Sequence, residues 1–270
     1  MKLDMGQAWN AATAMLAANR GIVVAIAGVF IFLPYLVLAL FLPQAVQGPA
    51  ETADPEVMMA MMQDLYLNNW WAFLLVTIIQ GIGMIALLIL LTDRRRPTVG
   101  EALAKGATGF ITYILAQILT GFMIALLIVF PIVAAVGSVT VAVIVGLVAA
   151  VAAVYLAIKF SLSAPVVAIE GERNPVQALR RSWQITKGNS LRLLAFYILL
   201  MIAMGVVLVL FTMIFGVVFA AVGGVVEEIG IAVVSSLGNS VFAVIFLAVL
   251  AAIHRQLAGP GTEEVSETFE

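Results

Sequence analysis

The 270-residue sequence contains no cysteine, a single histidine and few charged residues. The lack of cysteine excludes disulfide bonds and thiolate metal sites. Charged residues make up 10% of the chain, whereas hydrophobic residues make up 64%. A water-soluble domain of this size needs far more charge to cover its surface. The composition therefore predicts an integral membrane protein, and the net charge of −2 at pH 7 gives no reason to expect a nucleic-acid partner.

Six apolar segments are each long enough to cross the roughly 30 Å hydrocarbon core of a bilayer as a helix. They cover about residues 21–42, 70–91, 110–133, 139–158, 193–218 and 231–253. We therefore predict an all-α, polytopic protein with one six-span membrane domain over residues 1–255, followed by a disordered acidic tail over residues 256–270. Pro34 should kink the first span, and the methionine-rich segment 55–67 is expected to form a short helix on the outer surface.

The lysines and arginines are confined to four regions: the first 20 residues, residues 94–105, residues 159–192 and Arg255. With six spans, all four regions lie on the same side of the membrane. The connections on the other side carry only acidic residues or no charge. By the positive-inside rule, both termini are expected to be cytoplasmic. The first 20 residues lack the compact apolar core of a signal peptide, so we expect no cleavage there.

Residues 160–192 form the longest polar interruption between spans and contain a predicted amphipathic helix. Asn174 suits the N-cap and Pro175 the first helical position, and Gly188 is a natural stop. The helix has one apolar face, formed by Val176, Leu179 and Trp183. Its flank is cationic and carries Arg180, Arg181 and Lys187. Such a helix next to a span is expected to lie in the headgroup layer.

Three segments on the predicted cytoplasmic side share a pattern of a capping residue, Gln or Glu three positions later, alanine, and a large apolar residue. They begin at Asp4, Thr98 and Asn174, and each precedes a pair of spans. The pattern predicts three interfacial helices and a threefold repeat of an interfacial helix plus a transmembrane hairpin. The alternative is that the starts of unrelated amphipathic helices look alike, because caps followed by Glu or Gln are common.

The segment from Pro165 to Glu170, together with Ala178-Leu179-Arg180-Arg181-Ser182-Trp183-Gln184-Ile185-Thr186-Lys187-Gly188, resembles the membrane domain of glycerophosphoryl diester phosphodiesterases and related six-span bacterial proteins of unassigned function. The order of spans is similar over nearly the whole chain, but the specific sequence motif covers only about residues 160–195. The resemblance implies a bacterial cytoplasmic (inner) membrane location and an accessory role. In those enzymes a cytosolic barrel follows the membrane domain. Here only the acidic tail follows, so no catalytic residue is carried over.

Catalytic and metal-binding patterns are missing from the sequence, so we predict no enzyme activity and no cofactor. His254 is expected to be an interfacial residue at the end of the last span, since no acid lies near it in the sequence. Lys159 is expected to reach the interface from the end of the fourth span. Glu170 can form a structural ion pair with Arg173, or with Arg180 or Arg181, and so fix the central helix to the bundle.

Two functional hypotheses follow. In the first, a basic belt binds anionic membrane lipids or docks a protein partner; its residues are Arg94, Arg95, Arg96, Arg180, Arg181, Lys187 and Arg192. Topology signalling alone would give the same charges. In the second, the protein is a transporter or channel for a lipid-like or small apolar solute, with Gln80, Gln117 and Tyr113 lining its path. An intramembrane enzyme is the weakest hypothesis, because acid, base and nucleophile do not cluster.

Overall fold

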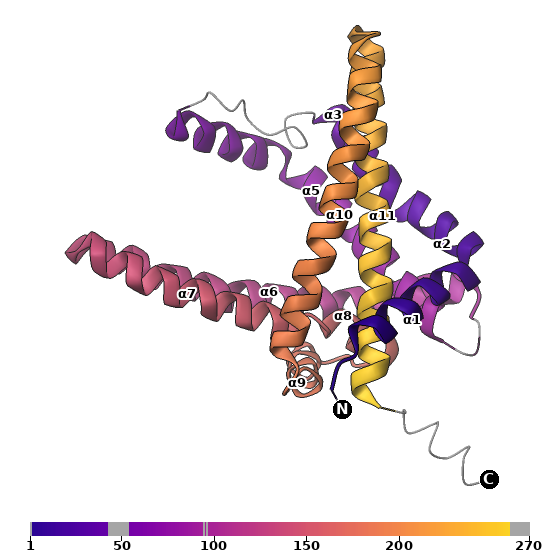
Figure 1. Cartoon of the computed structure of the whole chain (residues 1–270), viewed down its shortest axis with the longest axis horizontal. Coiled ribbons are helices and arrows are strands. Elements are labelled where there is room, and N and C mark those ends of the chain that lie inside the picture. Colours follow the sequence, from indigo (N-terminus) through magenta and orange to yellow (C-terminus); the bar gives the residue numbers. More distant parts are fainter. Residues whose placement is uncertain (1, 43–53, 94, 96, 260–270) are drawn as a thin grey trace.

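The computed structural model describes residues 2–42, 54–93, 95 and 97–259, and over these residues it is built of helices without strands (Figure 1). The helices are α1 (Met5–Ala18), α2 (Arg20–Ala27), η1 (Gly28–Phe32), α3 (Leu33–Phe41), α5 (Pro55–Thr92), α6 (Val99–Gly137), α7 (Val139–Phe160), α8 (Ser163–Ile169), α9 (Pro175–Ile185), α10 (Ser190–Ala220) and α11 (Gly224–Ala258).

Six stretches of the described chain are long and apolar enough to cross a membrane. They are Arg20–Phe41, Glu56–Thr92, Val99–Gly137, Val139–Ile169, Ser190–Ala220 and Gly224–Ala258. The predicted all-α fold with six membrane-spanning helices is confirmed. The last helix continues to Ala258 and so includes the first residues of the predicted tail, whereas residues 260–270 lie outside the described chain.

Two of the long helices are interrupted at positions with a local cause. Pro34 lacks an N–H and its ring collides with the carbonyl one turn earlier, so the preceding turn widens into the π-helical segment η1. In α5, Asn69 has non-helical angles (φ −122°, ψ 17°). The methionine-rich segment before Asn69 is helical, and it forms the first part of α5 rather than a separate element.

The three predicted caps form hydrogen bonds, although the helices that follow them differ. The side chains of Asp4, Thr98 and Asn174 each accept from the backbone N–H three residues later, and Glu101 completes a capping box with Thr98. Helices α1 and α9 end before the spans begin. In contrast, α6 runs without a break from its cap into the span. The threefold repeat and the interfacial position of these helices therefore stay predictions.

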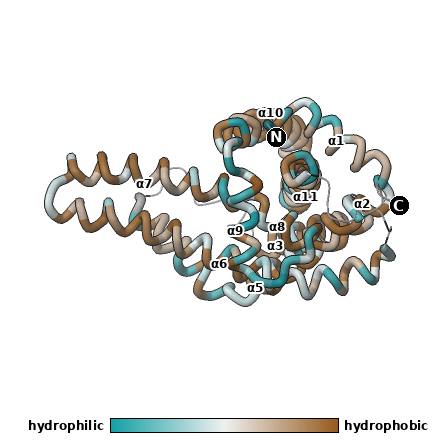
Figure 2. The backbone as a smooth tube through the Cα atoms, turned by 90° about the horizontal axis from the view of Figure 1, so that it is seen from below, coloured by the Kyte–Doolittle hydropathy of each residue, from teal (hydrophilic) through white to brown (hydrophobic). Residues whose placement is uncertain are grey.

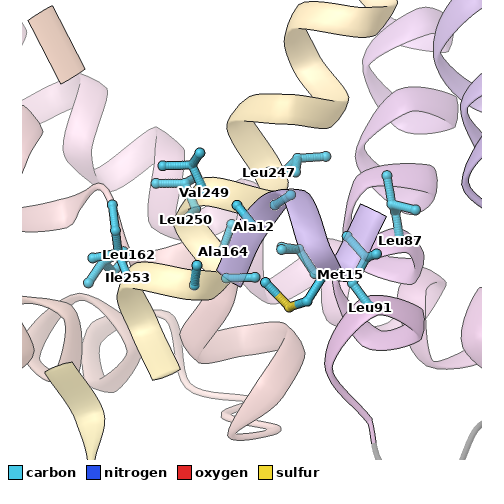
Figure 3. Packing of buried hydrophobic residues seen from close by; sticks show 14 of the residues in the cluster. Ala12, Met15, Leu87, Leu91, Leu162, Ala164, Leu247, Val249, Leu250 and Ile253 are labelled. Atoms are coloured by element: carbon cyan, nitrogen blue, oxygen red, sulfur yellow. The ribbon is translucent and has the colours of Figure 1, made fainter. Parts of the chain in front are cut away.

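The hydrophobic core lies at one end of the long helices (Figure 3). Every residue from 85 to 91 at the end of α5 is buried, and so is every residue from 247 to 254 near the end of α11. Figure 3 shows Ala12 and Met15 of α1 packed between these two stretches. The described lysines and arginines also lie toward this end of their helices, and we call it the basic end.

Close contact between α5 and α6 depends on glycine. A Cβ added at Gly106 would lie 2.8 Å from the carbonyl oxygen of Ile82 and 3.1 Å from the Cβ of Ala86. Backbone atoms cannot move aside as the tip of a side chain can. The two helices therefore approach at a distance that a larger residue at 106 would not allow.

Away from the basic end, the helical hairpins diverge. The α6–α7 hairpin extends to one side in Figure 1, whereas α10 and α11 rise together in another direction. Figure 2, seen from below, shows the same apolar α6–α7 hairpin standing clear of the other helices. In α11, 56% of the most apolar window is buried, compared with 6% in α10 and none in α6. The apolar side chains of the α6–α7 hairpin and of α10 therefore face outward into the surroundings, whereas α11 belongs largely to the core.

Candidate functional site at the basic end

Helix α9 forms because its polar ends are satisfied locally. The side chain of Asn174 accepts from the N–H groups of Val176 and Gln177, and Pro175 occupies the first helical position, where no N–H is needed. Gly188 has a φ of 79°, a conformation that favours glycine and turns the chain toward α10. The predicted start and stop of this helix are therefore both present.

Two fully buried hydroxyl groups fasten α9 to the end of α7. Ser182 Oγ donates to the carbonyl oxygen of Lys159 (2.7 Å) and accepts from the N–H of Leu162 (3.2 Å). Thr186 Oγ1 lies 3.4 Å from the same Lys159 oxygen and 2.9 Å from the carbonyl oxygen of Ser182. These bonds satisfy backbone groups that the end of α7 leaves free. Two residues of the Ser-Trp-x-x-Thr-Lys-Gly segment thus have a structural role.

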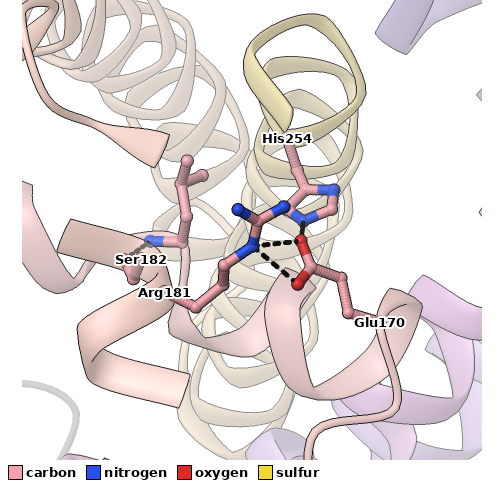
Figure 4. Close-up of polar contacts among 5 residues, drawn as sticks. Glu170, Arg181, Ser182 and His254 are labelled. Carbon is pink, nitrogen blue, oxygen red and sulfur yellow. Dashed lines mark hydrogen bonds and ion pairs between the residues drawn. The ribbon is translucent and has the colours of Figure 1, made fainter. Parts of the chain in front are cut away.

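An ionic cluster joins α9 and α11 through Glu170, which follows α8 (Figure 4). Arg181 Nε donates to both carboxylate oxygens, at 2.8 and 3.1 Å, and His254 Nε2 lies 2.9 Å from Oε1. Burial acts to raise the pKa of Glu170, but the hydrogen bonds and charges of His254 and Arg181 outweigh it and hold the pKa below its ordinary value. Glu170 is therefore ionised and locked in place near neutral pH.

The position of His254 differs from the interfacial one that we predicted. The residue is 3% exposed, it faces Glu170, and its Nδ1 has no hydrogen-bond partner in the described chain. The two residues are 84 positions apart, so no local pattern could reveal the pair. A carboxylate that orients a histidine is half of a catalytic triad. Among the described residues no hydroxyl bonds His254, and the pair links the end of α8 to α11.

Of the three arginines that could pair with Glu170, Arg181 forms the contact, whereas Arg173 forms other contacts. Arg173 Nη1 donates to Thr108 Oγ1 (2.8 Å), and the carbonyl oxygen of Arg173 accepts from Thr112 Oγ1 (3.0 Å). Arg173 thus binds α6, because the turn at Gly171 (φ 71°) directs the chain away from Glu170. Arg181 on α9 forms the ion pair with Glu170 instead.

The residues of the predicted basic belt have different surroundings. Arg192 Nη1 donates to the carbonyl oxygen of Leu3 (3.2 Å), while the N–H of Leu3 donates to Asn189 (2.9 Å), so these residues hold the N-terminal segment. The backbone N–H of Arg95 donates to Asp93 (2.9 Å). Arg94 and Arg96 lie outside the described residues. Arg181 is paired with Glu170, which leaves Arg180 and Lys187 exposed and without an acidic partner within the described chain.

Lys159 is buried without an acidic partner, although we predicted that it reaches the interface. The residue is 2% exposed, and its Nζ lies 5.4 Å from the ring centroid of Tyr155 and 5.3 Å from that of Trp183. Cation–π contacts of this kind contribute about 0.5–2 kcal/mol each. The rings carry no net charge, so the ammonium group has no counterion among the described residues. An anion beside Nζ would therefore be favoured.

Two further kinds of site concern metal binding, which was not expected from the sequence, and the transport path, which was. The described residues contain no group of three or more histidines, cysteines or acids that could hold a metal ion. Gln117 is exposed on α6, and Gln80 on α5 is partly buried with its Nε2 unpartnered. Within the described chain, no hydrogen bond joins Gln80, Gln117 and Tyr113 into the polar lining that a transport path would need.

Comparison with known proteins places the chain in a family whose function is not assigned. Neither a curated protein nor a solved structure matches it. No comparison links it to the glycerophosphoryl diester phosphodiesterases, so that similarity stays a resemblance of short segments and layout. A single family model matches residues 3–257, nearly the whole chain. The chain therefore belongs to the family described as a domain of unknown function, DUF7847.

Proposed function

We propose that the chain is a non-catalytic membrane protein with an accessory role, whose basic end binds anionic lipid headgroups in the cytoplasmic leaflet of the bacterial inner membrane. The observation that carries the proposal is the set of cations without acids. Arg180 and Lys187 are exposed and unpaired, and Lys159 is buried and unpaired. The nearby acids Glu170 and Asp93 are already engaged by other residues. Phosphate groups at a membrane surface would supply counterions for these three cations.

Topology signalling explains only part of this arrangement. The positive-inside rule depends on how many lysines and arginines flank the spans. It gives no reason to bury one of them, Lys159, beneath two aromatic rings without an acid. Passage of an apolar solute would need a continuous polar or open path, and no observation within the described chain favours one. Lipid binding accounts for both the exposed and the buried cations.

The proposal is tested by counting bound lipids on the purified full chain with native mass spectrometry. The protein is delipidated in detergent and titrated with phosphatidylglycerol or with zwitterionic phosphatidylcholine. We expect a preference for phosphatidylglycerol. Because each basic residue near an anionic surface contributes about 1 kcal/mol, an Arg180→Gln, Lys187→Gln double variant should bind it about 30-fold more weakly.

The control variant, Glu227→Gln with Glu228→Gln, changes two charges near the start of α11, at the opposite end of the molecule. It should bind phosphatidylglycerol as the unmodified chain does. Equal binding of the two lipids by the unmodified chain, or an equal effect of both double variants, would contradict the proposal.

A further inference from the structure

We propose that Lys159 and Lys187 bind the phosphate of one anionic phospholipid, whose acyl chains lie along the apolar surfaces of α7 and α10. This inference rests on the proposed function and adds the site, its ligand and the orientation of that ligand. It concerns a bound lipid in a defined place, in contrast to the general attraction of a basic surface for a membrane.

The charges around Lys159 favour an anion beside it. No ion pair of the described residues includes Lys159, and the charge that acts on it is that of another cation, Lys187. Lys159 stands in the last turn of α7 and Lys187 just after α9, and one phosphate between their two ammonium groups would stabilise both. Among the described residues no carboxylate forms an ion pair with either lysine, so none is placed to hold the ammonium group of a zwitterionic headgroup. A headgroup with a net negative charge is therefore preferred.

The cover over Lys159 is thin enough for a headgroup to reach it. The two rings that lie over Nζ are partly exposed themselves, Tyr155 by 44% and Trp183 by 36%. They meet edge to face, with centroids 5.7 Å apart, where α9 crosses the end of α7. Trp and Tyr are enriched at the depth of the headgroups, because one part of each ring is apolar and another forms hydrogen bonds. A phosphate at this depth would reach the ammonium group past the exposed sides of the two rings.

The surfaces beside this point fit the acyl chains of a lipid. Ser161 Oγ and Tyr197 Oη lie 3.0 Å apart and join α7 to α10 near the basic end. Beyond this contact the two helices run in different directions (Figure 1). Both carry exposed apolar side chains along their length, among them Ile144, Leu147 and Val151 on α7 and Leu199, Ile202 and Val206 on α10. Cations at the base and apolar walls beyond them match the order of headgroup and chains in a phospholipid.

Trp183 allows the site to be observed directly. The other three tryptophans, Trp9, Trp70 and Trp71, are exposed and are replaced by phenylalanine in the full-length chain. The delipidated protein in detergent is titrated with phosphatidylglycerol that carries a spin label near the top of one acyl chain. We expect saturable quenching of Trp183 fluorescence. Unlabelled phosphatidylglycerol should displace the probe, whereas diacylglycerol, which lacks the phosphate, and inorganic phosphate, which lacks the chains, should not.

The variants test which residues hold the phosphate. Lys159→Met with Lys187→Gln should bind the probe at least about tenfold more weakly, because both charge-assisted hydrogen bonds are lost. Lys159→Arg should retain binding. Lys2→Gln with Lys105→Gln removes two lysines elsewhere at the basic end and should change little. If the Lys159→Met variant fails to fold, Lys187→Gln alone still removes an exposed lysine and should weaken binding about fivefold.

Three results would overturn the inference. They are quenching that does not saturate or does not depend on the headgroup, displacement by diacylglycerol or by inorganic phosphate, and an equal loss in the site and control variants. If native mass spectrometry still shows the preference for phosphatidylglycerol, the site is wrong and the proposed function stands. If that preference is missing as well, both proposals fail.

Discussion

The contact between Glu170 and His254 gives the most direct test of how the basic end is held together. The Glu170→Ala variant removes the one hydrogen-bond partner that His254, itself 3% exposed, has among the described residues, and leaves both of its ring nitrogens unpaired there. An unsatisfied buried polar group costs about 1–3 kcal/mol. The same variant frees Arg181, whose side chain is 41% exposed and can be hydrated, so that contact is worth at most about 1 kcal/mol.

Double-mutant cycles separate these two terms from the loss of side-chain packing. We expect a coupling energy of about 1–2 kcal/mol between Glu170 and His254, and about 0.5 kcal/mol between Glu170 and Arg181. The control is the pair Asp93 and Lys105, which lie 3.8 Å apart at the same end with side chains 25% and 55% exposed. Its coupling energy should be close to zero.

The measurement is the free energy of unfolding of each variant, followed by circular dichroism as a mild detergent is replaced by a denaturing one. A coupling between Glu170 and His254 no larger than that of the control pair would refute the reasoning. It would mean that the ionic cluster forms without fixing α11 to α9, and that apolar packing alone holds the basic end together.

Three further predictions concern the same end of the protein and its helix contacts. The pKa of Glu170 in the folded protein lies below its ordinary value of 4.5, so the ionised side chain stabilises the fold fully above about pH 4.5 and loses this effect as the pH falls through the folded pKa. The difference in the free energy of unfolding between the unmodified chain and Glu170→Gln, measured at several pH values, should therefore shrink over that range. Ser182→Ala should destabilise the protein by about 1–3 kcal/mol in the same unfolding assay, since the backbone groups of Lys159 and Leu162 lose their partner, whereas Thr77→Ala, at an exposed residue bonded only to its own helix, should have little effect. Gly106→Ala should lower the midpoint of unfolding at a cost of about 1–3 kcal/mol, while Gly121→Ala in the same helix, with open space around it, should be neutral or stabilising; equal effects would contradict the close contact of α5 and α6.

Hydropathy and capping patterns were enough to predict the six spans and the three capped helix starts, but not the short helix α8. Spans are long apolar runs, and caps depend on residues only three positions apart, so both are local properties of the sequence. Asp4, Thr98 and Asn174 cap helices as predicted. The same local reasoning did not predict that the segment before Asn69 and the following span form one helix, α5, because no residue there signals whether the helix stops or only bends at Asn69.

The contacts that build the site are long-range, and for that reason the sequence did not reveal them. His254 pairs with Glu170 across 84 residues, and the hydroxyl of Ser182 reaches the end of α7 across 23. Charge alone made Arg173 as good a partner for Glu170 as Arg181. Only the path of the chain after Gly171 separates the two. Charge also suggested an exposed Lys159, whereas the rings of Tyr155 and Trp183 cover it.

The central claim of this account is that all the cations lie on the cytosolic face of the membrane, and cysteine labelling tests it most directly. Because the chain has no cysteine of its own, single variants can be labelled in intact cells with a membrane-impermeant maleimide. Ser138→Cys and Val222→Cys, in the turns after α6 and α10, should react from outside. Gln184→Cys, exposed on α9, should react only after the cells are permeabilised. Labelling of Gln184→Cys from outside, with protection of the two turns, would contradict the orientation and the lipid site that depends on it.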